Sequence, residues 1–244
     1  MITKGFKPNI VDAPFDNSLT DSNQLTTGEA SKKIVLRDLC SLTTFDSIFT
    51  LPNGNIYVVK DDLFWRISMN GTRFPGYPKM LNELFPSVLS PVDTIFTDRF
   101  DWTWVIKRTQ VWKVDASGND IIVNDPISLR DASPLSNIAN STINAVLAIN
   151  AQQNTQPSVF FLGNKYWVDD NYDGSSDDNT EHKISEMFTS SQKVPESING
   201  ALWLSTNGSF IFSESHFWKV NLERTALRTL PGYPKSTQKY WFGC

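Results

Sequence analysis

Hydrophobic and polar residues alternate over short stretches along most of the chain after residue 44, as they do in half-buried β-strands. In the first such region the alternation predicts strands over residues 45–49, 56–60 and 64–67, with the pair Asn53-Gly54 as a hairpin turn. A turn-rich stretch at 75–78 is followed by a predicted short helix over 79–84, which Pro86 would end. The pattern therefore predicts an antiparallel β-unit with a short helix at its rim.

The same order of elements returns along the chain, and each copy carries a tryptophan in its third strand. These tryptophans lie 47, 55 and 51 residues apart, at positions Trp65, Trp112, Trp167 and Trp218. A repeat near fifty residues is typical of β-propellers, and four copies predict four blades, at about 40–90, 91–137, 138–193 and 194–244. A large aromatic side chain at a fixed place in each repeat favours packing between blades over ligand binding. Tyr77, Tyr233 and Trp102 stand outside this register and are freer candidates for a contact surface.

A short polar residue precedes each tryptophan at a nearly constant distance. Asp46, Asp93 and Asn199 each lie 19 residues before their tryptophan, whereas Asn144 lies 23 residues before its own. The loop at 150–157 accommodates the four additional residues, as loops between blade strands commonly do. The four positions are thus equivalent in the repeat.

Composition and charge narrow the class of protein. With 40% hydrophobic and 20% charged residues among 244, the chain can bury a core, and the repeats favour one domain after a polar, flexible linker over residues 1–39. A net charge of −4 and the lack of a lysine- or arginine-rich run argue against nucleic acid as a partner. The sequence shows neither 18 consecutive apolar residues nor a secretory signal, so no membrane span is expected.

Other features indicate an extracellular protein. Asn70, Asn140 and Asn207 each begin an Asn-x-Ser/Thr glycosylation signal. The only cysteines, Cys40 and Cys244, bracket the repeats, where a disulfide would close a ring. Because disulfides persist in oxidising compartments, we predict secretion, with the signal peptide belonging to a longer chain.

The sequence offers little for catalysis or for cofactor binding by side chains. His182 and His216 are the only histidines; neither belongs to a His-Glu-x-x-His zinc motif, and they do not form a convincing pair for haem. Residues 169–174 resemble the opening of a helix-loop-helix calcium site, but Thr180 stands where such a loop needs a bidentate glutamate. We therefore expect an exposed acidic turn there and no enzymatic activity from this chain.

Several motifs together resemble the hemopexin-like repeat domain, most closely the C-terminal one of matrix metalloproteinases. They are Phe-Asp-x-Ile at 45–48, Phe-Trp-Arg at 64–66, Gly-Tyr-Pro-Lys at 76–79 and 232–235, and the ending Trp-Phe-Gly-Cys at 241–244. The resemblance covers residues 40–244. It implies an all-β fold, a four-bladed propeller of four-stranded antiparallel blades with short rim helices. It also implies that the first strands line a central channel and that Cys40 pairs with Cys244.

The resemblance also implies a role for the four equivalent polar residues. In the family they stand at the channel entrance, where inner-strand backbone oxygens hold a cation, usually calcium. Here that ring consists of Asp46, Asp93, Asn144 and Asn199, and hard cations do prefer several oxygen ligands. The alternative is that these side chains cap strand ends and hydrogen-bond loop amides. Zinc would belong only to a catalytic domain that this chain does not contain.

The functional expectation is a non-catalytic binding domain of a secreted matrix metalloproteinase, which is a zinc metalloendopeptidase. Its partners would be collagen-like or other extracellular-matrix proteins, or protease inhibitors, and tethering would raise their local concentration near the protease. One alternative is a stand-alone protein that binds or stores a small cation, a polyamine or haem. Another is an adhesion module of a matrix protein.

Overall fold

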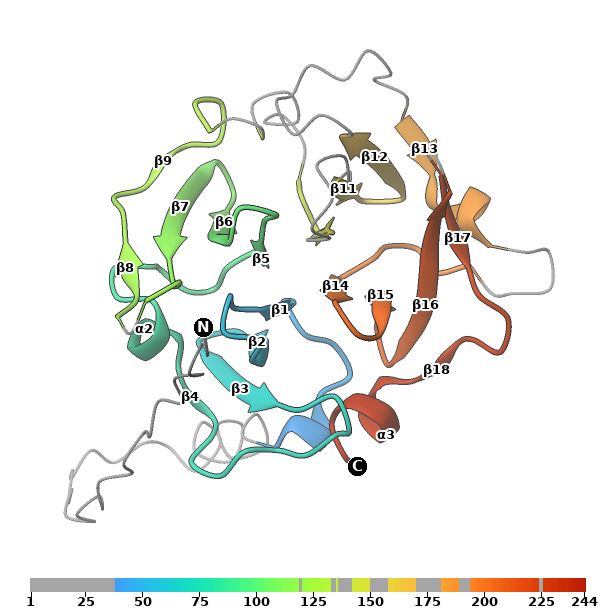
Figure 1. The fold of residues 1–244 in the computed structure, drawn as a ribbon, viewed down its shortest axis with the longest axis horizontal. Coiled ribbons are helices and arrows are strands. Elements are labelled where there is room, and N and C mark those ends of the chain that lie inside the picture. Colours follow the sequence, from blue (N-terminus) through green and yellow to red (C-terminus); the bar gives the residue numbers. More distant parts are fainter. Residues whose placement is uncertain are drawn as a thin grey trace, which may run out of the picture.

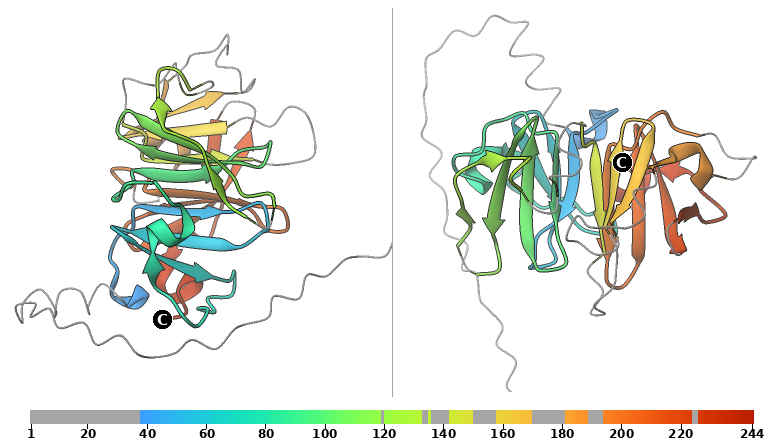
Figure 2. Two further views of the ribbon diagram at one scale, coloured as in Figure 1. Left: turned by 90° about the vertical axis from the view of Figure 1, so that its left-hand side faces the viewer. Right: turned by 90° about the horizontal axis from the view of Figure 1, so that it is seen from above.

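The computed structural model describes residues 38–118, 120–132, 135, 142–149, 158–169, 181–188, 194–223 and 226–244. Its strands form four antiparallel sheets, and the sheets are arranged as blades around a centre (Figure 1). Turned on its side, the ring is a disc about as thick as one strand is long (Figure 2). The predicted four-bladed propeller is confirmed, and each sheet lies inside the range predicted for its blade.

Blade 1 follows the predicted order of elements closely. It consists of β1 (Ser47–Thr50), β2 (Ile56–Lys60), β3 (Leu63–Ile67) and β4 (Lys79–Met80), each antiparallel to the next. The β1–β2 turn contains Gly54, whose φ of 79° suits a glycine. The rim helix α2 (Leu81–Leu84) is shorter than predicted, because residues 79 and 80 pair with β3 as a strand.

The other blades repeat this plan with additions at their outer edges. Blade 2 holds β5 (Thr94–Thr97), β6 (Trp102–Lys107), β7 (Gln110–Asp115), β8 (Ile122–Val123) and β9 (Ile127–Ser128). Blade 3 holds β10 (Ala145–Ala148), β11 (Ser158–Leu162), β12 (Lys165–Asp169) and β13 (Glu181–Lys183), followed by the 3-10 helix η3 (Ile184–Met187). Blade 4 holds β14 (Gly200–Leu204), β15 (Gly208–Ser213), β16 (His216–Glu223), β17 (Ala226–Thr229) and β18 (Lys235–Ser236), and α3 (Thr237–Trp241) follows. Two third strands, β7 and β16, each pair with two outer segments.

The first strand of every blade lies nearest the centre, as the resemblance implies (Figure 1). These strands, β1, β5, β10 and β14, contact one another in a closed circle. A side chain also joins the adjacent inner strands β1 and β5. The Ser47 hydroxyl donates to the Ile95 carbonyl at 3.1 Å and accepts from the Ile95 N–H at 2.9 Å. A strand edge that faces the channel thereby obtains hydrogen bonds from the next blade.

The core consists of four apolar clusters, and each cluster lies between two neighbouring blades. Every repeat tryptophan belongs to the cluster shared with the preceding blade, and their exposed fractions are 1–4%, in Trp65, Trp112, Trp167 and Trp218. Trp65 of blade 1, for example, packs with Leu202 and Phe210 of blade 4. The prediction that the tryptophans pack between blades is confirmed.

Two boundaries differ from the sequence prediction. Asp38 and Leu39 were assigned to the linker, but Leu39 is 1% exposed in the blade 1–blade 4 cluster and begins the 3-10 helix η1 (Leu39–Ser41). In addition, the inner strand of blade 1 begins at Ser47, two residues later than predicted. Asp46, the residue before β1, does not continue the strand ladder. Its N–H donates to the carbonyl of Val59, although Val59 is the ladder partner of Ser47. Residues 1–37 lie outside the described residues.

Candidate functional site: the channel mouths and the ring closure

The four predicted ring residues come together at one mouth of the central channel. They line a single opening of about 200 Å³, together with Phe45, Val92, Thr142 and Ile143. Each occupies the same backbone position, since its N–H donates at 2.8 Å to a carbonyl of the second strand, in Val59, Ile106, Phe161 and Phe212. The four positions identified by their spacing from the tryptophans therefore lie together around one opening.

Three of the four ring side chains, those of Asp46, Asp93 and Asn144, point back to the hairpin between the second and third strands of their own blades. That hairpin has a residue with positive φ in every blade, at Asp61 (55°), Arg108 (54°), Gly163 (62°) and Glu214 (51°). Asp46 Oδ2 accepts the N–H of Asp61 at 2.6 Å, and Asn144 Oδ1 accepts the N–H of Gly163 at 2.5 Å. Asp93 Oδ2 accepts the N–H of Arg108 in the same way. In three blades, therefore, the ring residue satisfies the N–H of a turn residue with positive φ, which is the capping alternative.

The mouth does not fit a calcium ion held by ring side chains. Asp46 uses both carboxylate oxygens inside its blade, because Oδ1 also accepts from Lys60 Nζ at 2.8 Å. The described residues contain no group of three or more His, Cys, Asp or Glu side chains that could hold a metal ion. These side-chain contacts do not test calcium binding at backbone oxygens. The sequence reasoning missed Lys60, although its place at the end of a strand beside the ring was a usable signal.

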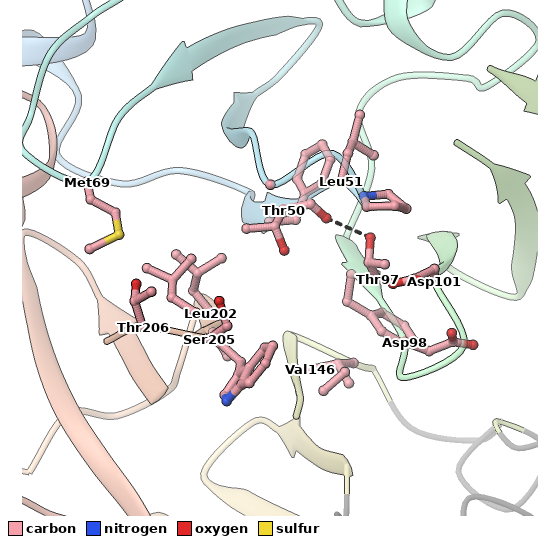
Figure 3. A pocket seen from close by; sticks show the side chains of 18 residues that line it. Thr50, Leu51, Met69, Thr97, Asp98, Asp101, Val146, Leu202, Ser205 and Thr206 are labelled. Carbon is pink, nitrogen blue, oxygen red and sulfur yellow. Dashed lines mark hydrogen bonds between the residues drawn. The ribbon is translucent and has the colours of Figure 1, made fainter. Parts of the chain in front are cut away.

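The opposite mouth of the channel holds a larger and partly apolar cavity, and Figure 3 shows the side chains that line it. Its cavity of about 270 Å³ lies at the far ends of the inner strands, and its wall includes Met69, Leu202, Trp203 and Asp101. Asp98, 1% exposed, also belongs to the wall, but its carboxylate accepts the Trp104 indole N–H at 2.7 Å and the Phe100 N–H at 2.8 Å. This hydrogen bonding fixes the β5–β6 turn beside the cavity.

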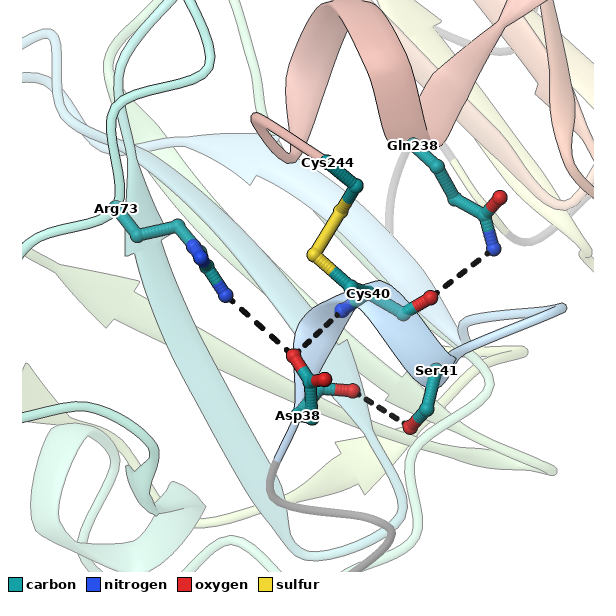
Figure 4. Close-up of polar contacts among 6 residues, drawn as sticks. All are labelled: Asp38, Cys40, Ser41, Arg73, Gln238 and Cys244. Carbon is teal, nitrogen blue, oxygen red and sulfur yellow. Dashed lines mark hydrogen bonds and ion pairs between the residues drawn. A yellow bond between two sulfur atoms is a disulfide. The ribbon is translucent and has the colours of Figure 1, made fainter.

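The ring closes where blade 4 meets blade 1 (Figure 4). Cys40 and Cys244 form the predicted disulfide, with their Cα atoms 5.7 Å apart. The Gln238 side-chain amide donates to the carbonyls of Cys40 at 3.2 Å and Leu42 at 3.1 Å. Asp38 accepts the Cys40 N–H at 3.0 Å and pairs with Arg73 at 3.4 Å. Covalent and hydrogen-bonded contacts therefore join the ends of the ring.

The aromatic residues outside the register are mostly packed. Tyr77 and Tyr233 are partly buried against the blade 1–blade 4 cluster, and burial raises the pKa of Tyr77. Trp102 is partly buried against the blade 2–blade 3 cluster, and the Lys113 ammonium lies 3.9 Å from its ring centre. All three side chains are therefore partly buried, and none of them stands out as an open contact surface.

The remaining predicted positions divide between surface and undescribed segments. Asn70 is exposed, and its side-chain oxygen accepts the Thr72 hydroxyl at 3.0 Å; Asn207 is half-buried in a turn. Asn140 and residues 170–180, most of the acidic run, lie outside the described residues. His182 stacks on Tyr166 with ring centres 5.0 Å apart, and His216 is exposed 6.5 Å from Trp218. Glycosylation of the asparagines stays a prediction.

Comparison with known proteins identifies the repeats. Residues 45–88 and 198–244, which form blade 1 and blade 4, match the family model described as Hemopexin. Blade 1 and blade 4 are therefore hemopexin repeats. Vitronectin of Oryctolagus cuniculus is 27% identical over 135 residues, which are 53% of this chain and 27% of that protein. Stromelysin-1 of Mus musculus is 27% identical over 153 residues, 62% of this chain and 30% of that protein.

Solved structures share the fold of this propeller over almost their whole length. A plant lectin with two metal binding sites from Cicer arietinum has a TM-score of 0.66 at 15% identity, covering 81% of this chain and 95% of that one. A hemopexin fold protein from cow pea has a TM-score of 0.62 at 12% identity, covering 80% and 94%. The curated relatives are longer, and the chain spans 30% or less of the two described above. In the described residues, no helix is long and apolar enough to cross a membrane.

Proposed function

We propose that this hemopexin propeller is a non-catalytic binding domain of a secreted matrix metalloproteinase, and that it recognises extracellular-matrix proteins or protease inhibitors. Matrix metalloproteinases are among its relatives, including Stromelysin-1 of Mus musculus and Matrix metalloproteinase-21 of Homo sapiens. The Cys40–Cys244 disulfide supports an oxidising, extracellular location. Its function would then be to hold a partner close to a protease.

The observation that carries a binding role is the outer edge of blade 2. Two short segments, β8 and β9, pair with β7 and end the sheet there. Ile122 of β8 is 59% exposed and Ile127 of β9 is 43% exposed, whereas the strands inside the blade are buried. An open strand edge with apolar side chains is a surface to which an extended peptide can add as a further strand.

The chemistry around this edge restricts the partner. The exposed Asp125 lies in the three-residue connection between β8 and β9, and the exposed Asp120 precedes β8. An extended segment that carries apolar residues with lysine or arginine beside them would complement both features. Segments of this composition are the partners we expect in a matrix protein or an inhibitor.

The binding role is tested with the purified chain on immobilised triple-helical collagen and on a metalloproteinase inhibitor protein, by biolayer interferometry. Ile122→Arg should weaken the binding that is found at least about tenfold, as loss of an apolar anchor does. Phe100→Arg is the matched control, because Phe100 is also 59% exposed but lies in the β5–β6 turn. Absence of binding to both classes, or hydrolysis of a matrix protein by the pure chain, would contradict the proposal.

A second candidate function, binding of a small cationic or apolar ligand by a stand-alone protein, rests on the wide channel mouth. Its cavity of about 270 Å³ is near the lower limit for ligand pockets and combines Trp203 and Met69 with Asp101. Titration with a polyamine or with haem should then quench Trp203 fluorescence to saturation, and Trp203→Leu should abolish that change. A linear, non-saturating response would exclude this function.

A further inference from the structure

The ring residue of each blade and the last residue of its second strand vary together around the propeller. The last residue of the second strand is Lys60 in blade 1 and Lys107 in blade 2, the two blades whose ring residue is an aspartate. In blades 3 and 4, where the ring residue is an asparagine, the same position holds Leu162 or Ser213. A carboxylate and an ammonium group are therefore present together or absent together in each blade.

The blade 1 pair is an ion pair in a partly buried place. Lys60 Nζ lies 2.8 Å from Asp46 Oδ1 and 4.0 Å from Asp61 Oδ1. The side chains of Lys60 and Asp46 are 23% and 19% exposed, so water screens their attraction less than it would at the surface. Because Asp46 Oδ2 accepts the Asp61 N–H at 2.6 Å, both carboxylate oxygens have donors. This carboxylate has its charge balanced inside the protein.

Blade 2 balances its aspartate less directly. Lys107 Nζ donates to the Ser90 carbonyl at 3.0 Å, and Ser90 lies three residues before Asp93 in the chain segment that leads to the mouth. Asp93 itself accepts the N–H of Arg108. A second ammonium group is thus held beside the segment that carries the second ring carboxylate.

A calcium ion requires six to eight oxygen ligands and gains most of its affinity from ionised carboxylates. In each of the two blades whose ring residue is a carboxylate, a lysine ends the second strand, and the other two ring residues are neutral amides. To use Asp46, calcium would have to displace Lys60 and leave its ammonium group next to a divalent cation. Like charges at such a distance repel strongly where water is partly excluded.

We propose that the ammonium group of Lys60 is the resident counter-cation of Asp46 beside the narrow mouth, and that this propeller takes no calcium there. The ammonium group neutralises Asp46 and holds its carboxylate against the β2–β3 hairpin. The proposal concerns the mouth alone and stands whether or not the domain binds a matrix protein.

The first test uses the unmodified chain. Thermal unfolding in about 5 mM calcium chloride and in excess EGTA should give midpoints within about 1 °C of each other, because a ligand raises the midpoint only if it binds the folded state. Isothermal titration with calcium chloride should show no saturable heat. A calcium-dependent rise of several degrees, with one ion bound per chain, overturns the proposal.

Two variants test the role of the lysine from opposite sides. Lys60→Met removes the resident cation, and Asn144→Asp with Asn199→Asp adds carboxylates while keeping the lysine; both should acquire a calcium-dependent rise in midpoint. Lys165→Met is the matched control, because Lys165 also forms an ion pair, with Glu181, but on the exposed surface of blade 3. If Lys60→Met responds to calcium no more than Lys165→Met does, and the double Asn→Asp variant is equally unresponsive, the charge of Lys60 does not exclude the ion and the proposal fails.

Discussion

Replacing both Cys40 and Cys244 with serine removes the only covalent link between blade 4 and blade 1. The bridge joins residues 204 positions apart, so in the unfolded chain it closes a loop that contains nearly all of the described propeller. In the chain-entropy description, closing a loop of this size lowers the entropy of the unfolded state by an amount worth about 5 kcal/mol at 25 °C. Loss of that constraint should lower the free energy of unfolding by a similar amount.

The folded state should change little in the same variant. Gln238 still donates to the carbonyls of Cys40 and Leu42, which serine at position 40 preserves, and the rings of Phe45 and Phe242 remain 6.2 Å apart. The near-ultraviolet circular dichroism of the variant should therefore match that of the native protein. The difference should be confined to the stability, because the disulfide acts mainly on the unfolded chain.

Urea unfolding of the two proteins measures the loss, and thermal unfolding should show a fall of about 10–20 °C for a domain of this size. Adding a reductant should destabilise the native protein to the level of the variant and leave the variant unchanged. A loss below about 1 kcal/mol, with unfolding still two-state, would refute the chain-entropy reasoning for this ring.

Three further predictions concern the closure and the core. Gly243→Ala should lower the free energy of unfolding by about 1–3 kcal/mol, because the φ of Gly243 is +68° and a Cβ there would lie 2.2 Å from the Gly71 carbonyl oxygen. Gly76→Ala is the control: Gly76 has a φ of +81° but open space around it, so the loss in the same urea assay should be smaller. Trp112→Ala should cost about 3–5 kcal/mol, since Trp112 is 1% exposed between blades 1 and 2, and a loss below about 1 kcal/mol would contradict that packing. Burial raises the pKa of Tyr166 above 10.0, so its contribution to stability is full below that pH and is lost as the pH rises through the folded-state pKa. Ultraviolet titration should show tyrosine ionising later in the native protein than in urea, and coincident curves would contradict the prediction.

The sequence predicted the repeat plan because one physical signal runs through it. Strand β2 was predicted with its correct bounds, since Ile56–Lys60 is rich in β-branched and aromatic residues and follows an Asn-Gly turn. The tryptophans gave the register, and the register located Asp46 and its equivalents. Burial of a large side chain once per blade is a property that a single sequence displays directly.

What the sequence did not predict depends on geometry across turns. The bond from the Asp61 N–H to Asp46 exists only because Asp61 has a positive φ, which propensity for a non-glycine residue does not foresee. The late start of β1 has another cause, because the Asp46 N–H donates to the carbonyl of Val59, the ladder partner of Ser47. The second outer segment of blade 2, β9, was missed because two residues are too few to show a periodicity.

The contacts at the ring closure and at the narrow mouth indicate where the sequence of this propeller can vary. Its ends are joined by a disulfide, its clusters each need residues from two blades, and Asp46, Asp93 and Asn144 bind the turns of their own blades. A substitution at these places acts on stability first, because each group already has a partner. The outer segments carry less of this constraint: Ile122 is 59% exposed and can change without opening a cavity. Partner specificity should therefore be found at the outer edges and loops of the blades, where stability does not dictate the residue.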